Sequence, residues 1–315
     1  HGGVHHHNGF LNVNGIFEGR FDIILTNPPF GSKVEKTDRV TAQQIAVSQE
    51  QKRRYKKKYG EAYERARQRT EATRGEKIAS LFDLGHSAKT GNLLKQKTEI
   101  LFIERCIDLL KPGGRLGIVL PEGIFNNPSL QYVRTYCEDR ARIRAVVSLP
   151  QETFSSAGAT VKCSLLFMKK FTEAEKERYD TLQQEAHEEI EEAYASEIEA
   201  EHERLNAAIA AAKEEGSTDD VKALRKEKRD YDKQMASKKK EEARRLLKQR
   251  FPYAVFLYDA EHVGINATGE AAPNELYPND DLPPGFTEED TCVQRYRAFE
   301  ANADAFMLEN EDAPT

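Results

Sequence analysis

Paired cysteines and long apolar runs are the features that this 315-residue sequence lacks most clearly. No Cys-x-x-Cys pair occurs among its four cysteines, which are Cys106, Cys137, Cys163 and Cys292. This spacing argues against a zinc site and against a disulfide framework, and it fits a reducing compartment. No apolar run approaches the ~20 residues of a membrane-spanning helix, and no signal peptide is recognisable. We therefore expect a cytoplasmic protein without a membrane association.

A metal site is not expected either. The chain opens on a histidine-rich stretch in which His5 and His7 could ligate a metal if they lay on one face of a strand. Because nothing nearby completes a ligand set, we favour a polar loop of incidental imidazoles.

Charge is segregated along the chain, although the net charge is only −6. Residues 33–77 are clearly basic and residues 78–170 mildly so, whereas residues 171–250 are acidic overall and residues 251–315 strongly acidic. Local basic surface matters more for contact with nucleic acid than the charge of the whole chain.

One short stretch, Phe21 to Gly31, indicates a site. Its apolar run Ile23-Ile24-Leu25 predicts a buried strand, and the site interpretation would collapse if these residues were helical or exposed. The strand must end at Asn27, because Pro28 and Pro29 lack the N–H groups that a ladder needs. In open α/β sheets ligands bind at the carboxyl ends of strands, so Asn27 to Phe30 occupies a favourable position.

The residue types of this turn suit an exocyclic aromatic amine such as N6 of adenine. The lone pair of such an amine is delocalised into the ring, which makes it a poor nucleophile. Two fixed acceptors, the Asn27 amide oxygen and the Pro28 carbonyl oxygen, could hold both N–H groups and direct the lone pair at an electrophile. Phe30 could stack on the base. The alternative is a strand followed by a proline-rich turn with a core phenylalanine.

Asn27-Pro28-Pro29-Phe30 after a strand resembles the catalytic motif of amino-group methyltransferases that use S-adenosylmethionine. Four further stretches narrow the resemblance to the modification subunit of type I restriction–modification systems, an N6-adenine DNA methyltransferase. They are Leu109 to Gly123, Val146 to Phe154, Thr160 to Phe167 and Ala260 to Gly269. The resemblance covers roughly residues 1–170 and 251–285.

This resemblance implies specific roles. Asn27, Pro28, Pro29 and Phe30 would be catalytic, Phe30 and Phe154 would stack on a flipped adenine, and Asn27 would share a wall with S-adenosylmethionine. Double-stranded DNA and the specificity and restriction subunits of the same system would be the partners. The family binds its cofactor on a glycine-rich loop well upstream of the motif, and only 26 residues precede Asn27. We therefore expect a fragment, the C-terminal part of such a subunit, that lacks the main cofactor site and is inactive alone.

The basic segment 33–77 follows the turn directly and is expected to be helical. Its positive side chains cluster at Lys52, Arg53, Arg54, Lys56, Lys57 and Lys58. Tyr55, Tyr59 and Tyr63 recur every four residues and would share one helix face. Two interpretations remain open. Basic residues with interleaved aromatics could bind phosphates and stack bases, or the tyrosines could pack on the domain beneath an ordinary solvated helix. Because the segment directly follows the turn, where DNA must approach, we favour DNA binding by these six residues.

The fold class indicated is α/β, a Rossmann-like methyltransferase fold with a mostly parallel sheet. Strands are expected at 116–120, 143–149, 161–168 and 253–258, and the pair 143–149 and 161–168 could be antiparallel. A helix is expected from Thr98 to about Leu110, with Thr98 as N-cap and a left-handed glycine after Pro112 ending it. The catalytic region would span 1–170, and residues 251–315 would add a returning strand and an acidic tail.

Residues 171–250 depart from the rest in composition, with no Gly or Pro before Gly216. Apolar residues recur at i+4 through an acidic first arm, and a basic second arm follows the turn at 214–220. Opposite charges on adjacent arms predict a long antiparallel helical hairpin inserted into the catalytic region. A partly disordered charged insert is the alternative. We interpret the hairpin as an interaction arm.

Three functions are considered, of which we expect the first and keep the other two as alternatives. The first is methylation of adenine N6 in DNA. The second is the same chemistry on an RNA base or a protein glutamine, and the third is a non-catalytic binding protein built on the same fold.

Overall fold

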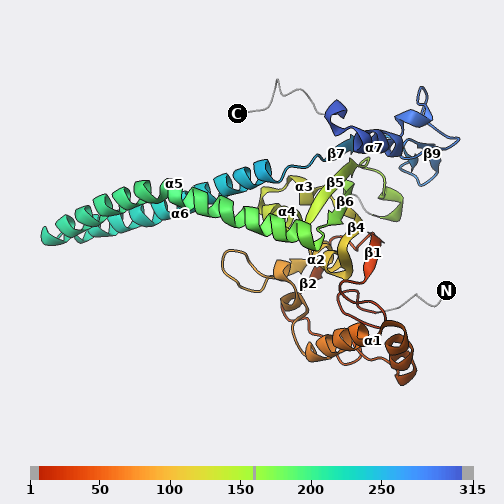
Figure 1. The fold of residues 1–315 in the computed structure, drawn as a ribbon, viewed down its shortest axis with the longest axis horizontal. Coiled ribbons are helices and arrows are strands. Elements are labelled where there is room, and N and C mark those ends of the chain that lie inside the picture. Colours follow the sequence, from red (N-terminus) through yellow and green to blue (C-terminus); the bar gives the residue numbers. More distant parts are fainter. Residues whose placement is uncertain (1–6, 159–160, 307–315) are drawn as a thin grey trace. The chain divides into compact units, whose positions relative to one another are not determined.

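The computed structural model of the chain describes residues 7–158 and 161–306 (Figure 1). Two compact units are present. The first is formed by His1–Thr172 together with Ala254–Thr315, and the second by Glu173–Tyr253. The second unit is thus an insertion between two parts of the first in sequence.

A five-stranded sheet forms the centre of the first unit, with the strand order β1-β4-β6-β5-β7. The pairing of neighbours gives the strand directions: β1 is parallel to β4, β5 is parallel to β7, and β6 is antiparallel to both β4 and β5. Four of the five strands therefore point the same way. The bounds are Phe21–Thr26 for β1, Leu110–Pro121 for β4, Ala141–Ser148 for β5, Cys163–Lys170 for β6 and Phe256–Asp259 for β7. The expected α/β class and the antiparallel pair are confirmed.

Two helices, α2 (Thr98–Leu109) and α4 (Gln131–Glu138), bury their apolar side chains in one cluster with the strands. Ile100, Ile103 and Ile107 of α2 lie at helical spacing, and each is at most 2% exposed. Complete burial of such a side chain contributes about 1.5–3 kcal/mol. The cluster therefore fixes α2 against β4.

The end of α2 differs from the expectation. The helix stops at Leu109, and Leu110 is already extended as the first residue of β4. A left-handed glycine does follow, since Gly113 has φ +77°, but it forms the bend within the β4 segment and does not cap the helix. Lys97 is the N-cap, without a side-chain bond, so the expected cap at Thr98 is also wrong. The hydroxyl of Thr98 has another partner, described below.

The strand β1 is present where it was expected, but its burial is not. Ile23 is 61% exposed and Leu25 is 77% exposed, while Ile24 points to the other face and packs on the main core. The reason is that the described residues leave this second face of β1 uncovered. The expectation of a strand buried on both faces is therefore wrong for Ile23 and Leu25.

The remaining elements of the first unit are short, apart from α1. They are β2 (Lys33–Val34), β3 (Gln96–Lys97), α1 (Gln49–Ala72), α3 (Gly123–Asn126), β8 (Val263–Ile265), β9 (Ala271–Asn274) and α7 (Cys292–Ala301), with 3-10 turns at 78–81, 83–85, 128–130, 155–157, 288–290 and 303–306. No helix in the described ranges combines the length and apolar character needed to cross a bilayer.

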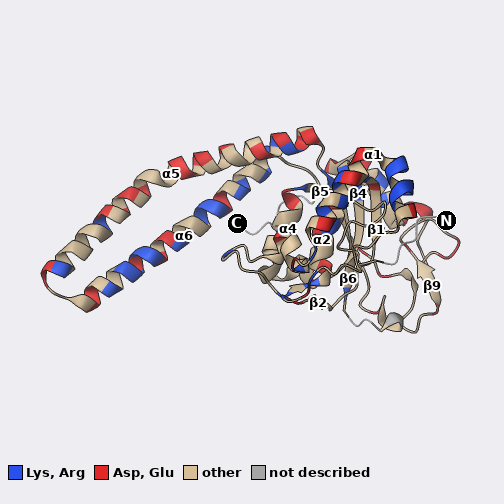
Figure 2. Cartoon of the chain, turned by 90° about the horizontal axis from the view of Figure 1, so that it is seen from below, with Lys and Arg blue, Asp and Glu red and all other residues tan. Residues whose placement is uncertain are grey.

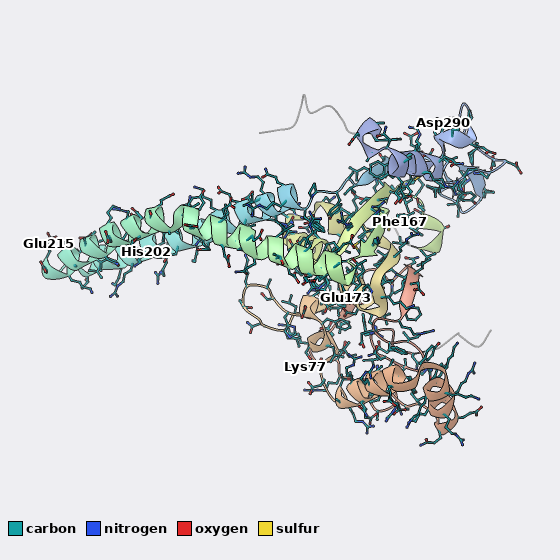
Figure 3. The ribbon with its side chains drawn as sticks, viewed as in Figure 1. Lys77, Phe167, Glu173, His202, Glu215 and Asp290 are labelled. Carbon is teal, nitrogen blue, oxygen red and sulfur yellow. The ribbon has the colours of Figure 1, made fainter. Side chains whose placement is uncertain are left out.

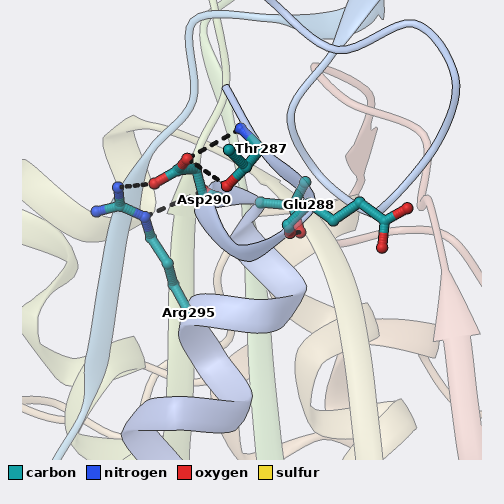
Figure 4. Close-up of polar contacts among 5 residues, drawn as sticks. Thr287, Glu288, Asp290 and Arg295 are labelled. Atoms are coloured by element: carbon teal, nitrogen blue, oxygen red, sulfur yellow. Dashed lines mark hydrogen bonds and ion pairs between the residues drawn. The ribbon is translucent and has the colours of Figure 1, made fainter. Parts of the chain in front are cut away.

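A carboxylate clamp holds the start of α7 (Figure 4). One oxygen of Asp290 accepts hydrogen bonds from the Thr287 backbone N–H at 2.9 Å and from its hydroxyl at 2.8 Å. The other oxygen accepts from Arg295 Nη2 at 3.1 Å. These bonds favour the ionised form and lower the pKa of Asp290. The clamp fixes the acidic turn that precedes α7.

The second unit is the expected long hairpin. Helix α5 spans Glu173–Glu214 and α6 spans Thr218–Arg250; with 42 residues, α5 is about 60 Å long at ~1.5 Å per residue. Gly216, with φ +74°, makes the turn. The helices are joined by a thin apolar seam that includes Leu205 and Met235, and by polar pairs such as His202 with Asp232 at 2.6 Å; Figure 3 labels His202 on α5.

Candidate functional site

The candidate site is the turn Asn27–Phe30, which we call the NPPF turn. It follows the carboxyl end of β1, where Thr26 is level with Ile118 of the parallel strand β4. Asn27 and Pro29 are exposed, Pro28 is buried and Phe30 is half-buried. Asn27 is therefore exposed directly after the carboxyl end of β1, with a buried proline next to it in the chain.

The downstream end of the NPPF turn is anchored to the start of α2. The backbone N–H of Thr98 donates to the carbonyl of Ser32 at 3.1 Å, and the two hydroxyls share a hydrogen bond of 2.7 Å. Directly after this contact, β2 and β3 pair antiparallel, with Val34 opposite Gln96. The turn is thus held by β1 on one side and by α2 on the other, through residues 66 apart in sequence.

A buried carboxylate lies next to this anchor. Glu99 is 1% exposed, and the Lys97 ammonium lies 3.8 Å from its carboxylate. Among the described residues, its Oε2 has no hydrogen-bond partner. A buried, unpaired carboxylate oxygen is uncommon in native proteins. We therefore include Glu99 among the candidate functional residues around the turn. Sequence reasoning placed it only on a core helix.

Glu122 is a second polar residue that sequence reasoning missed. It follows the last residue of β4, so it lies at the same sheet edge as Asn27. Its Oε2 accepts a hydrogen bond from the buried Ser164 hydroxyl at 2.9 Å. Burial, with the Glu122 charge as a smaller cause, raises the pKa of the nearby Cys163 thiol, which keeps that thiol neutral. The signal was present in the sequence, as an acidic residue directly after the apolar run that ends at Pro121.

Phe154 follows β5 at this same edge and is half-buried. It packs against a second apolar cluster that includes Leu149 and Phe256. In the strand order, β4 and β6 separate β1 from β5, and three strand spacings amount to about 14 Å. The structure thus brings Phe154 and the NPPF turn to one edge without bringing Phe154 against Phe30.

The six basic residues of 52–58 lie on the first half of α1, which a capping box at Ser48 begins. Arg53, Arg54, Lys56, Lys57 and Lys58 are exposed and Lys52 is half-buried. The Lys56 ammonium has only a distant carboxylate nearby, that of Glu64 at 3.9 Å. The exposed group therefore offers positive charge to solvent.

The tyrosines of α1 do not share that exposed surface. Tyr55 is 7% exposed and Tyr63 is 2% exposed, both in a cluster with Phe17. Tyr59 accepts a hydrogen bond from Arg20 at 2.6 Å, and Gly60, at φ 57°, breaks the helix after it. The packing interpretation is therefore correct for Tyr55 and Tyr63, whereas Tyr59 is half-buried.

Behind the site, Glu104 of α2 is 4% exposed. Its two oxygens accept the backbone N–H groups of Asp83 and Leu84, each at 2.8 Å. Burial is the largest influence and raises the pKa of Glu104 to about 7, although these two hydrogen bonds oppose the rise. The contact joins the 3-10 turns before β3 to α2, and so supports the anchor of the NPPF turn.

Metal ligands do not gather in the described part of the chain, which holds no group of three or more His, Cys, Asp or Glu side chains suited to an ion. His7 lies 3.1 Å from the Asn14 amide, and His5 lies outside the described residues. The four cysteines are free thiols and are buried.

Comparison with known proteins identifies the family. A family model described as N-6 DNA Methylase matches residues 83–244, slightly more than half of the chain. The chain belongs to the N-6 DNA methylase family. The match includes α2, β4, β5, β6 and most of the hairpin, whereas the NPPF turn lies before it. The family expected from the sequence is confirmed.

Three solved structures are each similar to a part of this chain. A class I S-adenosylmethionine-dependent methyltransferase from Listeria monocytogenes is 24% identical over 30% of this chain, with a TM-score of 0.26. A type I R-M system complex is 25% identical over 48%, with a TM-score of 0.29, and the EcoKI M protein of a type I restriction enzyme is 22% identical over 50%, with a TM-score of 0.27. The matches span only 27%, 21% and 22% of those chains. No curated protein matches the chain.

Proposed function

We propose that this N-6 DNA methylase family member provides the base-binding side of a DNA methyltransferase that modifies N6 of adenine. The observation that carries the proposal is the position of the NPPF turn. Asn27 stands exposed at the carboxyl end of an edge strand whose neighbour β4 is parallel, and the turn is fixed by the contact between Ser32 and Thr98. Rigid positioning of an acceptor is what an amine of low nucleophilicity requires.

The chemistry follows from the acceptors of the turn. The Asn27 amide oxygen and the Pro28 carbonyl oxygen accept the two N–H groups of the adenine amine. With both hydrogens held, the nitrogen lone pair is directed away from the ring plane. In a methyl transfer the N–C bond would form as the bond between the methyl group and its carrier breaks, and one amine proton would be released. Phe30 stacks on the base after it has left the duplex. The role of Phe154 on the same base stays an implication of the family, since β4 and β6 separate β1 from β5.

S-adenosylmethionine is the methyl donor that we propose, as the family implies. The described residues do not by themselves fit it. The large hollow of the first unit, about 570 Å³, lies over the sheet face and is lined by Ile23, Leu25 and Phe167 among others; Figure 3 labels Phe167 on β6. The residues of the NPPF turn do not line it. Asn27 would at most share one wall with the donor.

DNA contact is assigned to the exposed basic residues of α1. They neutralise phosphates without reading sequence, which leaves recognition to another component. Tyr59, among these residues on α1, bonds to Arg20 directly before β1, so the basic group lies towards the amino end of β1 and not at the turn. By analogy with type I systems, we propose a specificity subunit and a restriction subunit as partners. The buried, free thiols are compatible with a reducing cytoplasm.

The test uses the natural gene in its own genomic neighbourhood, so that every natural partner is present. N6-methyladenine is mapped across genomic DNA from cells with the natural protein and with Asn27→Ala. Loss of one positioned hydrogen bond at a transition state costs ~10²–10³ in rate, so we expect the modified motif to lose nearly all methylation. Asn302→Ala, an exposed asparagine at the end of α7, is the matched control and should change nothing.

Two results would contradict the proposal. Methylation at the natural level in the Asn27→Ala cells would remove that residue from the chemistry. Methylation found in RNA or on protein glutamine, with genomic DNA unmodified, would keep the amine chemistry but replace the substrate.

A further inference from the structure

The outer surface of α5 carries one continuous acidic stripe. Its side chains, spaced three or four residues apart, lie on the helix face directed away from the seam with α6. All are exposed, and the stripe consists of Glu185, Glu188, Glu192, Ser196, Glu199 and Glu203. It extends about 27 Å along the helix at ~1.5 Å per residue. We call it the acidic stripe.

The outer surface of α6 carries the opposite charge in the same manner. Its exposed side chains again lie away from the seam residue Met235, and they are Lys222, Lys226, Arg229, Lys233, Ser237 and Lys240. Figure 2 shows Asp and Glu gathered along α5 and Lys and Arg along α6. We call this set the basic stripe.

Neither stripe is used to hold the hairpin together. The ion pairs between α5 and α6 come from other positions: Glu189 with Arg250, Glu191 with Lys239, and Arg204 with Glu227. In the described part of the hairpin, the stripe residues make polar contacts only within their own helix, such as Lys222 with Asp219 at 3.5 Å. Their charges remain available to a partner outside the hairpin.

The two stripes match each other when read in opposite directions. From Glu185 to Glu203 the steps are three, four, four, three and four residues, and from Lys240 back to Lys222 they are the same. An antiparallel alignment therefore places Glu185 beside Lys240, Glu192 beside Lys233 and Glu199 beside Lys226. Four of the six aligned positions thus pair opposite charges, while Ser237 falls beside Glu188 and Ser196 beside Arg229.

We propose that the hairpin is a self-association surface on which the acidic stripe of one copy docks against the basic stripe of a second copy. Because α5 and α6 are antiparallel within a hairpin, the two hairpins then lie side by side and point the same way. The contact is heterologous, because it joins two different surfaces. An assembly of any length therefore keeps one free acidic stripe and one free basic stripe at its two ends, to which further copies can bind. Such exposed ion pairs are individually weak and sensitive to salt.

A nucleic acid is the other occupant to consider for the basic stripe. Phosphate binding needs only the positive charges, and it gives no reason for an acidic stripe of matching spacing on α5. A second copy accounts for both stripes with one contact, so we favour it.

The experiment is sedimentation velocity of the full chain with two triple variants. One reverses the acidic stripe with Glu185→Lys, Glu192→Lys and Glu199→Lys, and the other reverses the basic stripe with Lys226→Glu, Lys233→Glu and Lys240→Glu. We expect the natural chain to associate at ~0.01 M salt and to dissociate at ~1 M, where the screening length is only ~3 Å. Each variant alone should be monomeric at low salt. An equimolar mixture of the two should associate again, because each then presents the charge that the other lacks.

The control matched to the acidic-stripe variant reverses three exposed carboxylates of the first unit, Glu50→Lys, Glu61→Lys and Glu76→Lys, which changes the net charge by the same amount and sign. It should associate like the natural chain. The proposal is overturned if the natural chain is monomeric at low salt, if the stripe variants associate as it does, or if their mixture stays monomeric. Loss of binding to a duplex DNA probe in the basic-stripe variant, without a change in association, would assign that stripe to nucleic acid instead.

Discussion

Glu104 should make the stability of the first unit depend on pH, in the direction opposite to that of a typical carboxylate. Its pKa is raised to about 7 from an ordinary 4.5, chiefly by burial, with Asp108 and Asp83 adding smaller repulsions. In the unfolded chain the group ionises near the ordinary value. The folded state therefore retains a proton that the unfolded state has lost between these two pH values.

The sign and size follow from this difference. Because the unfolded chain binds fewer protons, stability is fully present below about pH 4.5 and falls as pH rises towards 7. At about 1.4 kcal/mol for each pH unit, the loss is about 3 kcal/mol. For a unit of this size 1 kcal/mol shifts the melting temperature by ~2–4 °C, so the whole change is roughly 6–12 °C.

The assay is thermal unfolding followed by circular dichroism in steps from pH 4.5 to 7.5, with Glu104→Gln as the variant. Because Gln stays neutral, the melting temperature of the variant should decline much less over this pH range. The decline that remains should reflect Asp108, because burial also raises the pKa of that carboxyl group. Glu50→Gln, at an exposed position on α1, should keep the natural slope. If Glu104→Gln keeps it as well, the carboxylate is ionised in the folded protein and the reasoning from burial is wrong.

Three further outcomes are expected. Charge reversal of Lys56, Lys57 and Lys58 should weaken binding to any DNA duplex and reduce the slope of log K against log salt by ~0.9 for each phosphate that is no longer neutralised, measured by fluorescence anisotropy; an unchanged slope would make α1 an ordinary solvated helix. Ile23→Thr with Leu25→Thr should leave the melting temperature nearly unchanged, because these side chains are 61% and 77% exposed, and should reduce any association that persists in high salt, measured by light scattering; a large loss of stability would show that the strand face is covered. Calorimetry of residues 1–315 should detect no S-adenosylmethionine binding at micromolar concentration, and tight stoichiometric binding would place a donor site that the described residues do not reveal.

Local patterns in the sequence were sufficient for most elements. The apolar run before Asn27 and the run from Leu116 to Leu120 both form strands, and the isoleucines of α2 fall on one buried face. The i+4 repeat that begins at Leu182 and continues to Ile209 lies within the helix Glu173–Glu214. In each case the information lies within one element, where the spacing of side chains fixes which of them face the core.

Such local patterns could not predict which distant segments of the chain contact one another. Periodicity placed Tyr55 and Tyr63 on one helix face, but only the packing against Phe17 shows that this face is buried. The bond between Ser32 and Thr98 joins residues whose sequence contexts predict a loop and a helix start, with no sign that they meet. The insertion of β6 between β4 and β5 likewise depends on pairing and cannot be read from any single strand.

The exposure of Ile23 and Leu25 bears directly on the site, because the interpretation relied on a buried strand. What the NPPF turn requires is a fixed strand end, and three features independent of that burial provide it. The pairing of Thr26 with Ile118 sets the position of β1 along β4, Pro28 is buried, and Ser32 is bound to Thr98 on the far side of the turn. The uncovered face concerns the middle of β1, which lines the hollow over the sheet. The exposure of this face therefore weakens the case for a cofactor site within the described residues. The position of Asn27 depends instead on the three contacts named above.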